Sequence, residues 1–344
     1  MVNSYPWSHM LMGVVVLLLV GLISASQGAV DIPAGTVFKM MIASIPIFDI
    51  SENWPNSWDV ILWRVRLPRV VLAGIVGGAL SISGAAYQAL FRNPLASPSL
   101  IGATSGAGLG ATVVLVSGMP VYFYGISILP AVAFLGAVLA VLLAYFIALR
   151  EGRISLTILI LAGVAISFGT SALTSLFMIK SDPDLRPVLS WLLGGFGTAQ
   201  WKYCYIVAPY IFFSLTILLF FSRIMNVLQF EEDHVRHLGV NLERTKLILI
   251  ASSTLCTAAA VSFTGPIAFV GLISPHVVRL IWGNDYRVLV PLSVLLGASF
   301  LILADLVART AFSPSELPVG VVTALCGVPF FLYLLRQRHR IKLK

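Results

Sequence analysis

The residues that could take part in chemistry are few, and the most reactive pair lies inside an apolar run. Ser274 and His276 flank Pro275, a combination that could serve nucleophilic catalysis in an intramembrane enzyme. No third group that would orient the histidine is evident, and the bend imposed by Pro275 explains the local composition. Neither a His-Glu-x-x-His nor a Walker motif occurs, and the three cysteines lack paired spacing. We expect no catalytic residue and no metal site.

One acidic residue, Asp305, lies well inside an apolar run, four positions before Arg309. An ion-coupled secondary transporter would bury ionisable groups of this kind near the middle of the bilayer. The spacing, however, puts Asp305 and Arg309 on one helical face, where a local ion pair accounts for both. Because no second proton-relay group accompanies them, the ion-coupled transporter is the weaker hypothesis.

The glycine-rich segment 102–110 has the composition of a dinucleotide-binding loop. No strand precedes it and no βαβ unit can surround it, so the nucleotide interpretation lacks its structural context. Close packing of small residues between membrane helices explains the segment better.

The composition of the chain is extreme, and it determines which kind of element positions these residues. Of 344 residues, 58% are hydrophobic and only 10% are charged, and the mean hydropathy is +0.96. Soluble domains carry roughly a quarter of charged residues, so the chain is predicted to be a polytopic membrane protein surrounded by lipid. A net charge of +8 could suggest nucleic acid, but basic residues of membrane proteins collect in cytoplasmic loops, and we expect no nucleic-acid partner.

Ten apolar runs are long enough to be candidate membrane helices, which predicts an all-α fold with a single transmembrane domain over residues 1–344. The first run ends in small residues like a signal peptide, but no Lys or Arg precedes it, so an uncleaved span is favoured. An even number of spans puts both termini on one side. The expected spans are 10–29, 69–90, 99–117, 127–149, 154–179, 203–222, 246–264, 266–282, 288–308 and 317–335.

Basic residues decide which side of the membrane each loop occupies. With both termini in the cytoplasm, 14 of the 22 Lys and Arg residues fall in inner loops or the C-terminal tail, against 8 outside. This agrees with the positive-inside bias. The outer segments are then about 30–68, which contains three tryptophans typical of a membrane interface, and about 180–202. In the second of these, Asp182-Pro183-Asp184 predicts the start of a short helix and the residues 191–195, with Gly194 and Gly195, predict its end.

Several arginines lie on the outer side, against that bias. Arg64, Arg66 and Arg69 crowd the outer end of the second span, and Arg309 stands at the outer end of the ninth. An acidic partner would explain them, because facing opposite charges steer association. Snorkelling of long side chains to the interface is the alternative.

Two inner segments interrupt the apolar pattern. The polar segment 222–246 carries eight charges, and apolar residues at helical spacing predict a short amphipathic helix interrupted at Gly239. An ordinary solvated loop is the alternative interpretation. In the segment 91–98, Pro94 and Pro98 bracket a tight bend that must break both adjoining helices at the membrane surface.

Three stretches occur in a fixed order along the chain and resemble one family. They resemble the FecCD-type permease subunits of ABC importers for ferric siderophores, haem and vitamin B12, from about Arg64 onward. The stretches are Arg66-Leu67-Pro68-Arg69 leading into Gly84-Ala85-Ala86-Tyr87-Gln88-Ala89-Leu90-Phe91-Arg92-Asn93-Pro94-Leu95-Ala96; the segment 265–279, which contains Gly265-Pro266 and Ser274-Pro275-His276; and Ala304-Asp305-Leu306-Val307-Ala308-Arg309 followed by Glu316-Leu317-Pro318-Val319-Gly320.

This resemblance implies a type II ABC importer permease in the cytoplasmic (inner) membrane of a prokaryote. Such permeases are homodimers with about ten helices per subunit, two ATP-binding subunits below and one extracytoplasmic substrate-binding protein above. ATP and Mg²⁺ would bind the ATPase, so this chain would need no cofactor and would not be an enzyme. The cargo is expected to be a metal chelate, foremost an iron–siderophore complex, with cobalamin or haem as alternatives.

The resemblance also assigns roles to the two contact surfaces. The polar segment, about 223–246 in its cytoplasmic part, becomes the coupling loop that contacts the ATPase. Arg66, Arg69 and Arg309 match positions that pair with acidic residues of the binding protein. The coupling residues are expected to be Glu231, Glu232, Val235, Arg236, Leu238, Gly239 and Val240.

Finally, the resemblance implies a cytoplasmic gate and a translocation path. Asn93 and Leu95, together with Ser155 and Leu156, match positions that close the inner end of the path. Asn93 could instead cap only its own turn. Residues facing the path would come from the second and fifth spans and include Thr170, Ser171 and Thr174.

Overall fold

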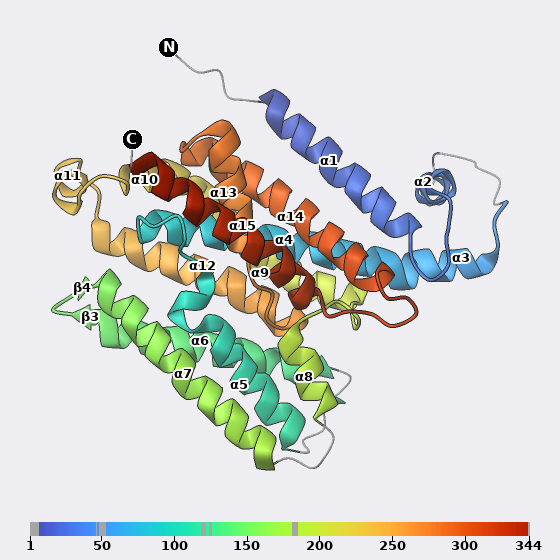
Figure 1. Ribbon diagram of the computed structural model, residues 1–344, viewed down its shortest axis with the longest axis horizontal. Helices are drawn as coiled ribbons and strands as arrows, with labels where there is room; N and C mark the ends of the chain where they lie inside the picture. Colours follow the sequence, from blue (N-terminus) through green and yellow to red (C-terminus); the bar gives the residue numbers. More distant parts are fainter. Residues whose placement is uncertain are drawn as a thin grey trace.

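Helices dominate the computed structural model, which describes residues 7–45, 47, 53–117, 122–123, 126–180 and 185–342 (Figure 1). Two short antiparallel hairpins, β1–β2 and β3–β4, join helices at opposite ends of the bundle. The first half contains α1 (Trp7–Ser26), α2 (Ala34–Ala43), α3 (Asn56–Val60), the π-helical η1 (Ile61–Arg66), α4 (Leu67–Leu90), the 3₁₀ turn η2 (Pro98–Ile101), α5 (Ala103–Val116), β1 (Tyr122–Phe123), β2 (Ile126–Ser127), α6 (Ile128–Ala148), β3 (Leu149–Arg150), β4 (Arg153–Ile154) and α7 (Leu156–Lys180).

The second half of the chain continues the same pattern, with three short helices between the long ones. The polar segment 222–246 folds as two of these short helices and the start of a long one. The elements are α8 (Arg186–Leu193), α9 (Trp201–Phe220), α10 (Ser222–Val227), α11 (Glu232–His237), α12 (Leu242–Thr264), α13 (Val270–Trp282), α14 (Tyr286–Thr310) and α15 (Val319–Lys342).

The predicted all-α membrane fold is confirmed, and a helix stands at each of the ten expected spans. Within the described residues, seven helices are long and apolar enough to cross a membrane. The other three positions hold the shorter apolar helices α5, α13 and the 319–333 part of α15. The count of about ten spans is therefore approximate, because these three would cross the hydrocarbon core only with help from their neighbours.

Helices α4 and α12 form the centre of the bundle. Their most apolar windows are 83% and 72% buried within the chain, against 17% for both α1 and α7, which lie at its edges. Small residues allow α4 to approach its neighbours closely. A Cβ added at Gly84 would lie 1.8 Å from the carbonyl oxygen of Gly271 on α13, so the two backbones are in contact there.

The glycine-rich segment 102–110 also allows two helices to pack closely, as predicted. A Cβ at Gly106 of α5 would lie 2.3 Å from the carbonyl oxygen of Gly136 on α6. Helices α5 and α6 thus pack backbone to backbone, and the small residues permit this approach.

The second span was predicted at 69–90, and α4 (Leu67–Leu90) matches it within two residues. The helix itself is longer, because α3 and η1 extend it back to Asn56, 35 residues in all. A proline inside a helix normally breaks it, because proline cannot donate to the helical ladder. The structure accommodates Pro68 at the start of α4 by a π-helical turn, η1, directly before it. Arg64, Arg66 and Arg69 consequently lie on a continuous helix.

The described parts of the segment 30–68 pack with the end of α1 around a small second apolar core. Trp54, Trp58 and Trp63 are half-buried and pack on this core, and the indole N–H of Trp54 donates to Asp59. The predicted outer helix is present as α8 and ends before Gly194, which has a left-handed φ of 70°. Its expected start at residues 182–184 lies outside the described residues.

Candidate functional site

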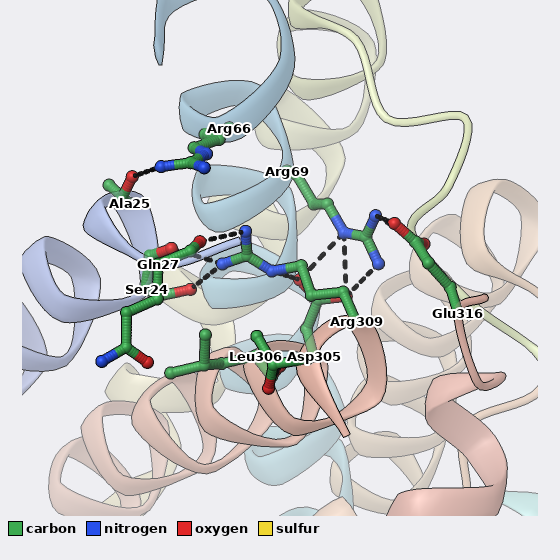
Figure 2. Close-up of polar contacts among 10 residues, drawn as sticks. Ser24, Ala25, Gln27, Arg66, Arg69, Asp305, Leu306, Arg309 and Glu316 are labelled. Carbon is green, nitrogen blue, oxygen red and sulfur yellow. Dashed lines mark hydrogen bonds and ion pairs between the residues drawn. The ribbon is translucent and has the colours of Figure 1, made fainter. Parts of the chain in front are cut away.

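A cluster of buried charges joins α4 to the C-terminal end of α14, which is expected to be the outer end. Arg69 places two guanidinium nitrogens on Asp305, with Nη2 to Oδ1 at 2.8 Å and Nε to Oδ2 at 2.9 Å (Figure 2). Its third nitrogen, Nη1, donates to both oxygens of Glu316 at 2.9 and 3.1 Å. Arg69 therefore lies between two carboxylates, one from α14 and one from the loop that leads into α15.

Arg309 and Arg66 tie the same region to the end of α1. Arg309 lies 3.5 Å from Asp305 and donates to the Ser24 hydroxyl at 2.7 Å and to the Gln27 carbonyl at 3.0 Å. Arg66 donates to the carbonyls of Ala25 at 2.9 Å and Ser26 at 2.8 Å, and also to that of Val30. The carbonyls of Ala25 and Ser26 belong to the C-terminal end of α1, where the backbone acceptors favour a cation.

The three predicted docking arginines are thus brought together, but as buried groups with partners inside the chain. Arg66, Arg69 and Arg309 are 4%, 8% and 9% exposed, whereas the side chain of Glu316 is 47% exposed. The predicted pair of Asp305 and Arg309 exists, but Asp305 bonds Arg69 more closely. The docking role of the arginines stays a prediction, and Glu316 is the most accessible part of the cluster.

At the opposite end, which is expected to be the inner one, the polar segment forms the predicted short helix, α11. The helix ends at His237, and Gly239 follows with a φ of 77°, a conformation that favours glycine. Val235 is buried and anchors α11, while Leu238 is 65% exposed. Phe230, just before the helix, is also 60% exposed, so two apolar side chains project from a charged surface.

Charges on α11 connect it to neighbouring segments. Glu232 lies 3.1 Å from Lys246 at the start of α12 and 3.8 Å from Arg92. Arg236 lies 3.9 Å from Glu232 on the same helix. Glu231 is exposed at the N-terminal cap and Val240 is half-buried in the turn.

A second inner contact holds α10 against the start of α14. Asn226 donates to Asp285 at 2.7 Å and accepts from the Tyr286 N–H at 2.8 Å. Hydrogen bonds from Arg287, followed by that from Asn226, lower the pKa of Asp285 to about 2. Asp285 is therefore ionised at neutral pH, and the two elements stay joined.

The predicted gate residues lie in two separate turns. The Asn93 side chain accepts from the Leu95 N–H at 3.0 Å, which is the local cap that the sequence left as an alternative. Ser155 accepts from the Ile158 N–H at 3.4 Å at the start of α7, and Leu156 is half-buried. These contacts fit local turns, and the gate role stays a prediction.

The predicted path residues bond mostly to their own helix. The hydroxyls of Thr170 and Thr174 donate to carbonyls one turn earlier, at 2.9 and 2.8 Å, while Ser171 is exposed. An open cavity of about 740 Å³ lies elsewhere, and none of the three lines it. It is bounded by parts of α4, α5, α8, α12, the loop before α13, and α15.

Sequence reasoning did not assign a role to three groups that the structure makes prominent. Glu316 was part of a quoted motif, and Lys246 was counted only as a charge, yet both are paired with predicted site residues. Phe230 was part of the polar segment. An apolar residue beside a run of charges was the available signal for Phe230, whereas the partners of Lys246 depend on the tertiary fold.

Comparison with known proteins gives consistent matches over nearly the whole chain. The model of the FecCD transport family matches residues 16–337. The cobalamin import system permease protein BtuC of Halobacterium salinarum is 41% identical over 323 residues, with 90% of this chain and 86% of BtuC covered. The iron-uptake system permease protein FeuC of Bacillus subtilis is 37% identical over 299 residues, with 86% and 88% covered.

A solved structure extends this agreement to three dimensions. It is described as an inward-facing conformation of a candidate metal-chelate type ABC transporter. The two chains superpose with a TM-score of 0.84 at 30% identity, over 96% of this chain and 99% of the other.

Proposed function

This chain belongs to the FecCD transport family of ABC transporter permeases, and from that premise we propose that it forms the homodimeric translocation path of an importer for a metal chelate. The carrying observation is the family match over residues 16–337 together with the superposition on a metal-chelate type transporter. We favour an iron–siderophore complex as cargo. Relatives named for cobalamin import and for iron uptake are similarly close, so cobalamin is the principal alternative, followed by haem.

Two ATP-binding subunits would dock on the end of the bundle that carries α11. This end carries exposed Leu238 and Phe230 surrounded by charged residues, a combination suited to a groove in another protein. ATP and Mg²⁺ would be bound there, on the partner. Both termini would lie on this side, in the cytoplasm, with the chain in the inner membrane of a prokaryote.

One substrate-binding protein would dock on the outer end, at the arginine cluster. Three guanidinium groups meet three carboxylates there, since Asp31 acts on Arg66 while Asp305 and Glu316 pair with the other two, so docking would rest on acidic residues of a partner replacing one of these carboxylates. Because Glu316 is the exposed member, an incoming carboxylate would compete with it for Arg69. Docking would therefore exchange one ion pair for another.

The inner gate would be formed by the turns at Asn93–Leu95 and Ser155–Leu156 with their symmetry mates. Each turn offers one polar and one apolar residue, a combination that can exclude water and still separate. The local caps at Asn93 and Ser155 keep each turn in shape while it moves as a unit.

Uptake by a strain that lacks this chain tests the cargo. Labelled ferric siderophore, cobalamin and haem are compared with and without the restored gene. Loss of ferric siderophore uptake alone, restored by the gene, is the expected result. Selective loss of cobalamin or haem uptake would show that this compound, and not a ferric siderophore, is the cargo. No change in the uptake of any of the three would contradict the proposal that the cargo is one of these chelates.

A further inference from the structure

A buried ammonium group lies where α11, α12 and the β3–β4 hairpin meet. The side chain of Lys246 is only 4% exposed. Its Nζ donates to the Ile154 carbonyl at 3.1 Å and lies 3.1 Å from both Glu232 and Glu243. Ile154 belongs to β4, Glu232 to α11 and Glu243 to α12, so Lys246 connects three elements. Lys246 and these three partners are called the junction below.

Glu243 also binds the β3–β4 hairpin, at the same residue as Lys246. One of its oxygens contacts Lys246, and the other accepts from the Ile154 N–H at 2.6 Å. Both backbone polar groups of Ile154 are thus bound by side chains from the first turns of α12. Ile154 directly precedes Ser155 and Leu156, so the gate turn is fixed to the start of α12.

Glu232 makes the corresponding connection to the other gate turn. It is the residue of α11 that contacts both Lys246 and Arg92, at 3.1 and 3.8 Å. Arg92 directly precedes Asn93 and has a left-handed φ of 49°. A non-glycine residue adopts this conformation only where its surroundings hold it.

Burial makes this junction resistant to partial breakage. The three contacts share one ammonium group that is only 4% exposed, so lengthening any of them weakens a charge-assisted hydrogen bond that water replaces poorly. A displacement of α11 that carries Glu232 would therefore carry Lys246, and Lys246 would carry Ile154. Glu232 is bound in this way, whereas the neighbouring Leu238 is 65% exposed.

We propose that Lys246 is the positioning residue that transmits movement of α11 to the gate turn at 155–156, with Arg92 as a weaker branch to the turn at 93–95. The proposal rests on the function proposed above in so far as the ATPase moves α11. The mechanical link itself is a property of this chain alone. It can therefore be tested without the partner.

The direct test is a distance between spin labels at His237, on α11, and Arg153, on the hairpin, in full-length chain in lipid nanodiscs, diluted with unlabelled chain. Cys326 is replaced by serine because it is exposed, while Cys204 and Cys256 are buried. We expect one narrow distance distribution, broadened by Lys246→Gln and by Glu243→Gln. Arg244→Gln, which removes an exposed charge from the same turn, should leave it narrow. An unchanged distribution in both junction variants would overturn the proposal.

A functional test uses the complex with the ATPase that co-purifies with this chain. In Lys246→Gln, ATP hydrolysis should persist while uptake per ATP hydrolysed falls by about tenfold, a loss within the usual range of coupling energies. Arg244→Gln, which leaves the contacts of Lys246 intact, should keep the wild-type ratio of uptake to hydrolysis. An unchanged ratio of uptake to hydrolysis would contradict the proposal. Failure of the wild-type chain to bind any ATPase would instead contradict the proposed function, and the distance measurement would still decide the link.

Discussion

At the scale of single residues, Asp305 holds the outer end of the molecule together. It is 1% exposed and pairs with Arg69 and Arg309, which come from different helices. We predict that Asp305→Asn lowers the free energy of unfolding by about 3–5 kcal/mol, because two buried guanidinium groups lose their shared anion. Thermal unfolding in detergent measures this.

Glu316→Gln is the matched control for that substitution. It removes the other carboxylate on Arg69, but Glu316 is half exposed and an amide oxygen can still accept from Nη1. Its effect on stability should not exceed about 1 kcal/mol. Equal losses in the two variants would contradict the assignment of Asp305 as the buried anchor.

The same Glu316→Gln variant carries a second prediction, on docking. If the acidic binding protein competes with Glu316 for Arg69, removing the competing charge should strengthen docking, by up to about fivefold given the strength of half-exposed ion pairs. The affinity of the isolated binding protein for nanodisc-embedded permease measures this at low and moderate salt. Weaker docking by the variant would count against Arg69 as a docking residue.

The sequence alone predicted which arginines and which aspartate belong to this cluster, but it predicted only some of the contacts among them. Local spacing predicted that Asp305 and Arg309 share a helical face, and they do. The closer pairing of Asp305 with Arg69 spans 236 positions, so only the packing of α4 on α14 could reveal it. The burial of the arginines follows from the same packing, because η1 extends the helix outward past Arg66 and α1 ends beside it.

At the scale of helices, close contact between α4 and α13 depends on glycine. Gly84→Ala would place a methyl group 1.8 Å from the Gly271 carbonyl oxygen, so the helices must separate. We predict a loss of about 1–3 kcal/mol in unfolding free energy, as for overpacked cores. Thermal unfolding checks it. Gly35→Ala on α2, where a Cβ meets nothing within 4 Å, is the control and should be neutral or stabilising.

The gate prediction also concerns whole turns. Replacing Leu95 and Leu156 by glycine removes the apolar residue from each turn but keeps the hydrogen bonds of Asn93 and Ser155. Vesicles that contain the double variant should leak preloaded substrate without ATP, whereas wild-type vesicles stay tight. A double variant as tight as wild type would remove these residues from the gate.

Helix positions could be predicted from the apolar pattern, and the C-terminal ends of α4, α12 and α13 lie at the residues expected. The extension of α4 back through η1 and α3 was not predicted, because a π-helical turn leaves no periodic signal. The end of α8 was placed correctly because Gly194 adopts a conformation that glycine favours. Proline and glycine therefore predict a helix end only where their own backbone conformation determines it.

At the scale of the whole molecule, the two proposed contact surfaces lie at opposite ends of the helix bundle (Figure 1). The composition predicted the membrane fold, since only helices that satisfy their own backbone can carry so apolar a chain. The relative burial of the individual helices could not be predicted from the sequence. Helices α4 and α12 are central while α7 is mostly exposed, although all three are similarly apolar. An exposed α7 is available to lipid or to a second copy of the chain.

The most direct measurement of the central claim is transport by proteoliposomes that contain this chain, its co-purified ATPase and the binding protein. The account predicts accumulation of a ferric siderophore that requires ATP hydrolysis and continues when ionophores collapse all ion gradients. Uptake that follows an imposed ion gradient without ATP would contradict it, and would instead support an ion-coupled transporter.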